Sequence, residues 1–146
     1  MKKVRAKFKL TGDILGLDLG MRRTGVARIN TVARMAEPLD EIVMRDGFVE
    51  QVAQKISRYQ STAVVVGLPR GLDGQVTDQT RWTETIIQEL RQSLDVPVFT
   101  IDEAGTTIEA EKRVQDGQSV DSVAAGLLLE DFIKEVSRGR IEQVNL

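Results

Sequence analysis

Residues 14–29 read ILGLDLGMRRTGVARI and place a carboxylate, Asp18, inside an apolar run. The neighbouring side chains are those of a strand that is covered on both faces. A carboxylate at such a position costs several kcal/mol unless it is hydrogen-bonded, paired or bound to a cation. Gly20 follows almost at once and predicts a tight connection to a second strand. The rest of the chain is therefore expected to supply whatever compensates Asp18.

The composition predicts one domain over residues 1–146, with a basic N-terminal extension over 1–12. Of the 146 residues, 41% are hydrophobic and 29% charged, which suits a single core. The first ten residues, MKKVRAKFKL, lack the apolar stretch of a secretory signal, and no run is long enough to span a membrane. We therefore expect a cytoplasmic protein that does not associate with membranes.

The chain contains neither cysteine nor histidine. Their absence excludes a thiol nucleophile, a histidine general base and the commonest zinc ligands. Hydrolytic chemistry would then depend on carboxylates with a hard metal ion, and Mg²⁺ or Mn²⁺ fits best. The net charge of −2 does not favour sequence-independent coating of DNA, although a local basic patch could still bind nucleic acid.

The hydrophobic periodicity predicts an α/β fold with a five-stranded mixed sheet flanked by helices. The expected strands cover 14–19, 24–30, 37–44, 62–69 and 96–103, and the expected helices cover 47–60, 77–94, 106–117 and 119–136. Three strands in succession suggest an antiparallel meander, and the later alternation of strand and helix requires parallel crossovers. Ligands in such sheets bind beyond the carboxyl ends of the strands.

Acidic residues from three distant segments are expected to meet at that end of the sheet. Asp18 comes from the first strand, and Asp102 or Glu103 ends the fifth. Asp121 lies in the first turn of the last helix, at a spacing that predicts a side chain directed at the sheet. Because three converging carboxylates repel one another, the pattern predicts a metal ion between them.

Four ordered blocks resemble the YqgF family, also called RuvX: GLDLGMRRTGVA, VVVGLPRGLDG, DEAGTTIEAE and VDSVAAGLLLEDF. The resemblance runs from Ile14 to about Ile133. It implies an RNase H-like fold and a metal-dependent nuclease that hydrolyses phosphodiester bonds, with Holliday junctions or precursor 16S rRNA as substrate. The family is linked both to junction resolution and to ribosomal RNA processing.

The resemblance also implies the roles of individual residues. Asp18, Glu103 and Asp121 would be the catalytic acids and the ligands of Mg²⁺ or Mn²⁺, with Asp102 as the alternative ligand to Glu103. Arg22 and Arg23 would contact the nucleic acid near the scissile phosphate. The rim of the same cleft would include residues of the VGLP loop (Gly67, Pro69, Asp73, Gly74).

Two departures from the family pattern remove positive charge beside the expected substrate path. Ala104 stands where many members carry a basic residue, and the segment QDGQSV before Asp121 has none. They favour an alternative function, a catalytically weak module that binds RNA or a ribosome-associated partner. A second alternative, an actin-like phosphate-binding fragment, would need a second lobe that this chain is too short to hold. The sequence is compatible with a monomer or a homodimer.

Overall fold

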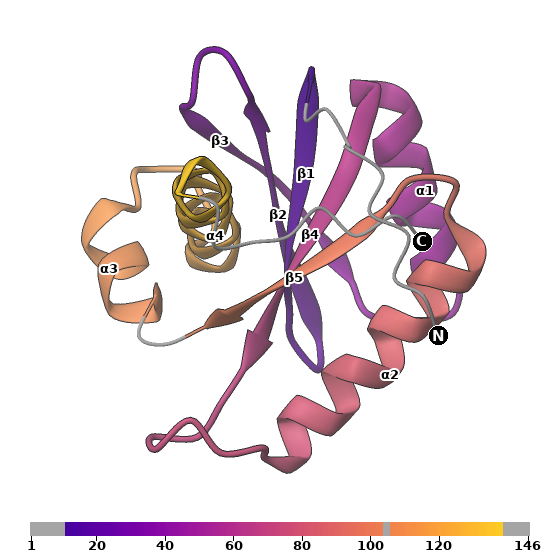
Figure 1. Cartoon of the computed structure of the whole chain (residues 1–146), viewed down its shortest axis with the longest axis vertical. Coiled ribbons are helices and arrows are strands. Elements are labelled where there is room, and N and C mark those ends of the chain that lie inside the picture. Colours follow the sequence, from indigo (N-terminus) through magenta and orange to yellow (C-terminus); the bar gives the residue numbers. More distant parts are fainter. Residues whose placement is uncertain (1–10, 104–105, 139–146) are drawn as a thin grey trace.

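Five strands form one mixed sheet in the order β3-β2-β1-β4-β5 (Figure 1). The computed structural model describes residues 11–103 and 106–138, so the basic residues of the N-terminal extension and Ala104 lie outside the described residues. The strands are β1 (Asp13–Leu19), β2 (Arg23–Asn30), β3 (Ala36–Val43), β4 (Ser61–Pro69) and β5 (Val98–Glu103). All five correspond to strands expected from the sequence.

The strand pairing confirms the meander and the parallel crossovers. β1 pairs with β2 and β2 with β3 in antiparallel fashion, whereas β1 pairs with β4 and β4 with β5 in parallel. The carboxyl ends of β1, β4 and β5 therefore share one end of the sheet, at the bottom of Figure 1. Any site at that end draws its residues from segments far apart in the chain.

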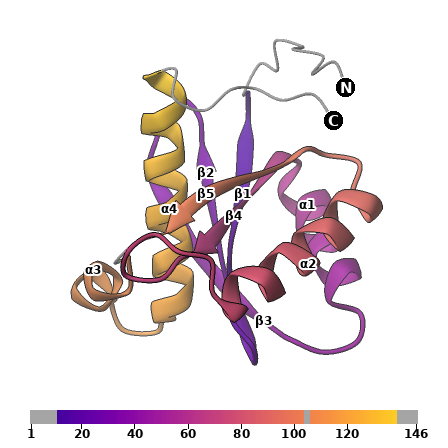
Figure 2. The same ribbon diagram turned by 60° about the horizontal axis from the view of Figure 1, so that its bottom comes forward.

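Two helical layers cover the two faces of the sheet (Figures 1 and 2). α1 (Phe48–Tyr59) and α2 (Asp78–Ser93) lie on one face, and α3 (Thr106–Arg113) and α4 (Val120–Ser137) on the other. The third helix ends at Arg113 rather than near Gly117, where the sequence placed its end. No helix in residues 11–103 or 106–138 is long and apolar enough to cross a membrane.

The alternation of side chains along each strand divides the core in two. Leu15, Leu17 and Leu19 of β1 pack against α1 and α2. Ile14, on the opposite face of the same strand, packs against α4. Because successive side chains point to opposite faces, Asp18 faces the α4 side.

Glycine allows α4 to approach the sheet very closely. A Cβ added to Gly25 of β2 would overlap the backbone carbonyl of Asp121 in the first turn of the helix. A Cβ on Gly16 of β1 would lie 2.6 Å from Leu129 Cγ, on the third turn. Since no other residue lacks a Cβ, these two positions set how near the helix can sit.

Polar contacts fix the start of α4 in the same place. The Ser119 side chain caps the helix by accepting a hydrogen bond from the Ser122 amide (3.2 Å). The buried Ser122 hydroxyl accepts a hydrogen bond from the Val26 amide of β2 at 3.0 Å. Together with Gly25, this bond holds the first turn of α4, and with it Asp121, against β2.

Gly25→Ala is expected to lower the free energy of unfolding by about 3 kcal/mol, because the new methyl group meets backbone that cannot move aside. Gly126→Ala is the matched control, since its Cβ would lie 3.1 Å from the nearest atom, the Ala36 Cβ, and alanine favours a helix. Urea unfolding measures both variants. Equal midpoints for the two would contradict this account of the helix contact.

Candidate active site

Asp18 and Glu103 lie on the same face of the sheet, at its carboxyl end. Phe99 of β5 belongs to the cluster beneath α4, and alternation places Glu103 on that face too. β4 lies between β1 and β5, and a Cβ on its Gly67 would lie 2.9 Å from Glu103 Oε2. The missing side chain of Gly67 thus leaves room for the Glu103 carboxylate to lean toward β1.

Asp102 faces the opposite side of the sheet. Its Oδ1 atom forms an ion pair with Arg70 Nε at 3.3 Å, and its side chain is exposed. The alternation of β5 therefore separates the two acids that the sequence left as alternatives. Glu103 lies on the same face of the sheet as Asp18, and Asp102 lies on the opposite face.

Asp121 joins this group from α4, but not in the way that the helical spacing suggests. Ala125 and Phe132, at the predicted inward positions, are fully buried, whereas Asp121 is exposed. It is the helix backbone at Asp121 that contacts the sheet, through Gly25. The expectation of an inward side chain was wrong, because at the first turn the helix backbone, rather than the Asp121 side chain, occupies the contact with β2.

The charges of the other two acids nonetheless act on Asp18. The pKa of Asp18 is raised to about 8, mainly by burial and further by the charges of Glu103 and Asp121. The pKa of Asp121 is also raised, first by burial and then by the charge of Glu41, while Arg23 acts in the opposite direction. Negative charge is therefore concentrated where the strands β1 and β5 end.

The donor chemistry of this group fits a hard divalent cation. All of its ligating atoms are carboxylate oxygens, the type that Mg²⁺ and Mn²⁺ prefer. A cation would also relieve the repulsion that raises the pKa of Asp18. Within residues 11–103 and 106–138, however, no three acidic side chains are close enough to ligate one ion as they stand. Carboxylates that repel one another stay apart, so ligation would require their side chains to turn inward.

Arg22 and Arg23 follow β1 at the tight turn, and both are exposed. The Arg22 carbonyl accepts a hydrogen bond from the Met44 amide at 2.8 Å, which fastens this turn to the end of β3. Arg23 shares the α4 face with Gly25, and its charge lowers the pKa of Asp121. The structure thus brings Arg23 close to the acids and leaves Arg22 at the adjacent corner.

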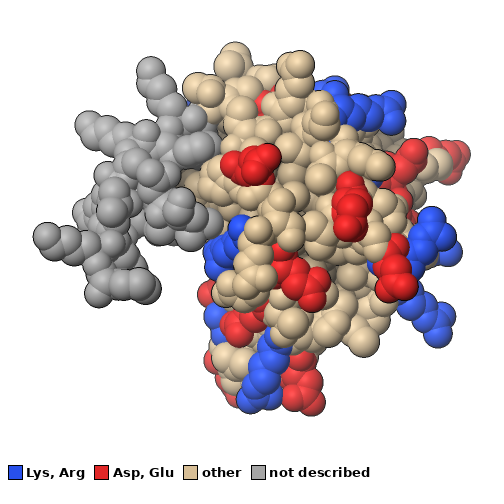
Figure 3. Space-filling model, turned by 90° about the vertical axis from the view of Figure 1, so that its right-hand side faces the viewer, with Lys and Arg blue, Asp and Glu red and all other residues tan. Residues whose placement is uncertain are grey.

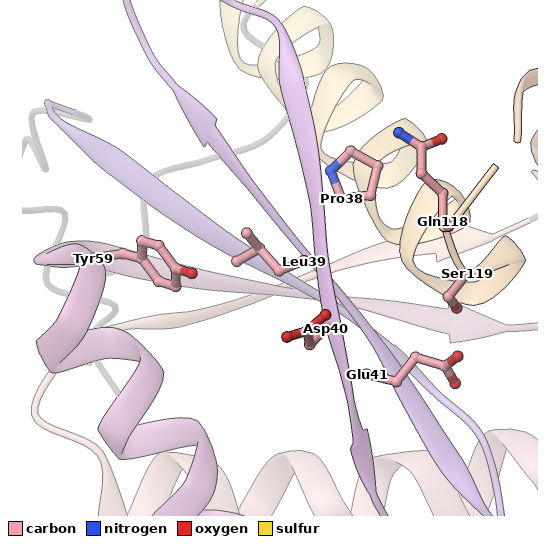
Figure 4. A pocket seen from close by; sticks show the side chains of 8 residues that line it. Pro38, Leu39, Asp40, Glu41, Tyr59, Gln118 and Ser119 are labelled. Atoms are coloured by element: carbon pink, nitrogen blue, oxygen red, sulfur yellow. The ribbon is translucent and has the colours of Figure 1, made fainter. Parts of the chain in front are cut away.

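Glu41 is an acid that the sequence analysis did not single out. β3 carries one residue more than β2 between the pairs Thr24–Ile42 and Val26–Leu39, and this bulge includes Glu41. The residue lines a pocket of about 430 Å³ together with Ser119 (Figure 4). One of its carboxylate oxygens is buried without a hydrogen bond. An acid on an edge strand is too ordinary for the sequence to signal this position.

The face covered by α1 and α2 offers no comparable concentration of one charge. Acidic and basic side chains are interspersed there among a larger area of uncharged residues (Figure 3). This mixture is that of a solvated surface and does not mark a path for a polyanion. The acids and Arg23 lie on the other face of the sheet.

Comparison with known proteins agrees with this arrangement. The family described as "RuvX: Holliday junction resolvase" matches residues 12–135. The chain belongs to the RuvX family. A relative from Roseiflexus sp. (strain RS-1), named "Putative pre-16S rRNA nuclease", is 36% identical over 132 residues, which cover 84% of this chain and 94% of the relative. A relative of the same name from Pseudomonas fluorescens (strain SBW25) is 35% identical over 133 residues, covering 84% and 92%.

Solved resolvase structures share the fold. RuvC of T. thermophilus, in complex with a Holliday junction substrate, matches with a TM-score of 0.59 at 13% identity, over 89% of this chain and 98% of that protein. The fowlpox virus Holliday junction resolvase matches with a TM-score of 0.55 at 12% identity, over 84% and 99%. The RNase H-like fold implied by the sequence blocks is confirmed, as is their assignment to RuvX.

The raised pKa of Asp18 predicts a pH-dependent loss of stability in the metal-free protein. The folded carboxyl retains its proton up to about pH 8, whereas the unfolded one loses it near pH 3.8. Stability should therefore fall as the pH rises through this interval. Asp18→Asn, which cannot ionise, should melt at a higher temperature than wild type at pH 8 in EDTA, and this advantage should shrink toward pH 4.

Thermal melts between pH 4 and pH 9 measure the effect. Asp102→Asn is the matched control, because it removes an exposed ion pair on the other face, and such pairs contribute about 0–1 kcal/mol. A difference between Asp18→Asn and wild type that stays constant across the range would show that burial and repulsion do not act on Asp18 as described.

Proposed function

We propose that this protein is a Mg²⁺- or Mn²⁺-dependent nuclease that hydrolyses phosphodiester bonds in structured nucleic acid, with precursor 16S rRNA in the cytoplasm as its substrate. Membership of the RuvX family and the names of the relatives support a nuclease. The names of the relatives favour ribosomal RNA over a DNA junction. A reaction without histidine or cysteine suits a phosphodiesterase that uses carboxylates.

The main support is the raised pKa of Asp18 at the carboxyl end of β1. Burial and two neighbouring acids all disfavour the ionised form of this residue, so the site is destabilised when nothing is bound. Arg70, the cation at the end of the neighbouring strand β4, pairs with Asp102 on the other face of the sheet. A bound divalent cation is the simplest way to offset this concentration of charge.

Each residue of the site has a distinct proposed role. Asp18, Glu103 and Asp121 would hold the metal, and Arg22 and Arg23 would bind the phosphates on either side of the cut. With a divalent ion held by these acids, the site would supply metal activation of a water molecule and stabilisation of the leaving 3′-oxygen. The close contact of Gly25 with α4 keeps Asp121 in register with Asp18, and Gly67 leaves space for Glu103 to turn.

Asp18→Asn and Glu103→Gln are each expected to abolish cleavage while leaving the fold intact. The loss should exceed the roughly 10- to 100-fold that follows removal of an outer-shell partner. Asp102→Asn should cut at the wild-type rate. The assay compares a precursor 16S rRNA fragment with a four-way DNA junction, each in Mn²⁺, Mg²⁺ or EDTA. Mn²⁺ should also raise the melting temperature of wild type more than that of Asp18→Asn.

Two results would contradict the proposal that this protein is a metal-dependent nuclease. Cleavage by Asp18→Asn in the presence of metal would show that the proposed acids take no part in the reaction. Tight binding of RNA by wild type without any cleavage would instead favour the non-cutting module. Activity on the junction alone would keep the nuclease but replace ribosomal RNA as its substrate.

Arg22→Ala combined with Arg23→Ala should weaken binding to nucleic acid and reduce its salt dependence. Each lost phosphate contact lowers the slope of log K against log salt by about 0.7 for single strands and 0.9 for duplex DNA. Lys134→Ala, in the last turn of α4 at the far end of the sheet, is the control and should leave the slope unchanged. Fluorescence anisotropy at several salt concentrations measures both. An unchanged slope in the double variant would exclude phosphate contacts.

A further inference from the structure

Large apolar side chains that are exposed to solvent gather at the active-site end of the sheet. The part of the chain that the structure describes has six of them, in two groups. Those at the active-site end are Met21, Val43, Leu72 and Val76. The other two, Val32 and Met35, lie at the β2–β3 turn, at the opposite end of the sheet.

Met21 and Leu72 protrude from turns on the two sides of β1. Met21 is 71% exposed and occupies the turn from β1 to β2. Leu72 is fully exposed in the loop between β4 and α2, which projects from the lower end of the sheet in Figures 1 and 2. Because β1 lies between β2 and β4, the two turns stand on either side of the strand that carries Asp18.

Both turns are held in place by hydrogen bonds. The Gly74 amide donates to the Gly71 carbonyl at 2.9 Å, which closes a turn with Leu72 at its second position. The Gly71 amide donates to the Gln75 carbonyl at the same distance. The bond from Met44 to Arg22 fastens the other turn. The apolar side chains are thus presented to solvent on fixed backbone.

No need of the fold accounts for apolar residues at these two positions. Turn positions favour small or polar residues, and burying a leucine or methionine side chain is worth about 1.5–3 kcal/mol that neither residue gains here. A single exposed apolar residue is common and needs no explanation. Two of them on opposite sides of a carboxylate site, with Arg22 next to Met21 in sequence, suit a ligand with both flat apolar surfaces and negative charge.

We propose that Met21 and Leu72 pack against unstacked nucleobases on either side of the scissile phosphate, so that the substrate is a strand that is unpaired at the cut. This inference rests on the proposed function. Bases inside a duplex are stacked and offer no face to a protein side chain, whereas those of loops, bulges and branch points do. Apolar side chains of this kind can also hold a base step apart. The substrate is therefore selected by its lack of stacking.

The test measures binding of full-length protein to three RNA probes of one sequence: a perfect duplex, a single strand and a duplex with a three-nucleotide bulge. All variants carry Asp18→Asn so that the probes are not cut. Met21→Ser and Leu72→Ser should each weaken binding to the bulged and single-stranded probes about three- to tenfold and leave the duplex unaffected. 2-Aminopurine in the bulge should brighten when the parent protein holds it away from its stacking neighbours, and brighten less with either variant.

Met35→Ser and Val32→Ser are the matched controls, since they remove exposed apolar side chains at the far end of the sheet. Melting temperatures verify that every variant is folded. Equal losses on all three probes, or no loss at all, would overturn the inference, as would losses of the same size in the controls. Cleavage of the probes by protein with Asp18 intact is measured separately, so a failure of the proposed function is distinguished from a failure of base recognition.

Discussion

The first turn of α4 rests on the backbone of β2, and the geometry of the candidate site depends on that contact. Gly25 is the residue opposite Asp18 in the β1–β2 pairing. A side chain at this position would push the helix away from the sheet and would carry Asp121 with it. The Ser122–Val26 hydrogen bond then fixes the helix along the strand. The distance between two acids that are 103 positions apart in the chain is thus set by one missing methyl group.

The sequence predicted the sheet because each strand carries its own signal. The apolar runs around Asp18 and in β4 have the composition of buried parallel strands, and the polar connections mark their ends. The meander and the parallel crossovers followed from the order of strands and helices along the chain rather than from any contact. The early end of α3 was not predicted, because helical spacing continues in the sequence beyond Arg113 while the backbone does not. Helix ends depend on capping and packing that periodicity does not report.

The sequence indicated which residues are candidates for the site better than it indicated how they are arranged. Asp18 was singled out because a carboxylate inside an apolar strand is costly, and Glu103 because of the family resemblance. Strand alternation in the structure separates Glu103 from Asp102. The orientation of Asp121 was not predicted, because helical spacing does not show that the backbone of this turn, rather than its side chain, makes the contact with the sheet. Glu41 was missed because it lies in a β-bulge, which shifts the alternation of β3 by one residue and leaves no mark in the sequence.

The order of the acids along the chain has a consequence for biosynthesis. The meander β1–β2–β3 consists of neighbours in sequence and can form as soon as it leaves the ribosome, since local contacts form fastest. Glu103 ends the last strand, and Asp121 lies on the helix that follows all the strands. A nascent chain that ends before β5 therefore holds Asp18 alone, and one that ends before α4 still lacks Asp121. The ribosome, which contains RNA, therefore does not meet the assembled candidate site until α4 has been synthesised.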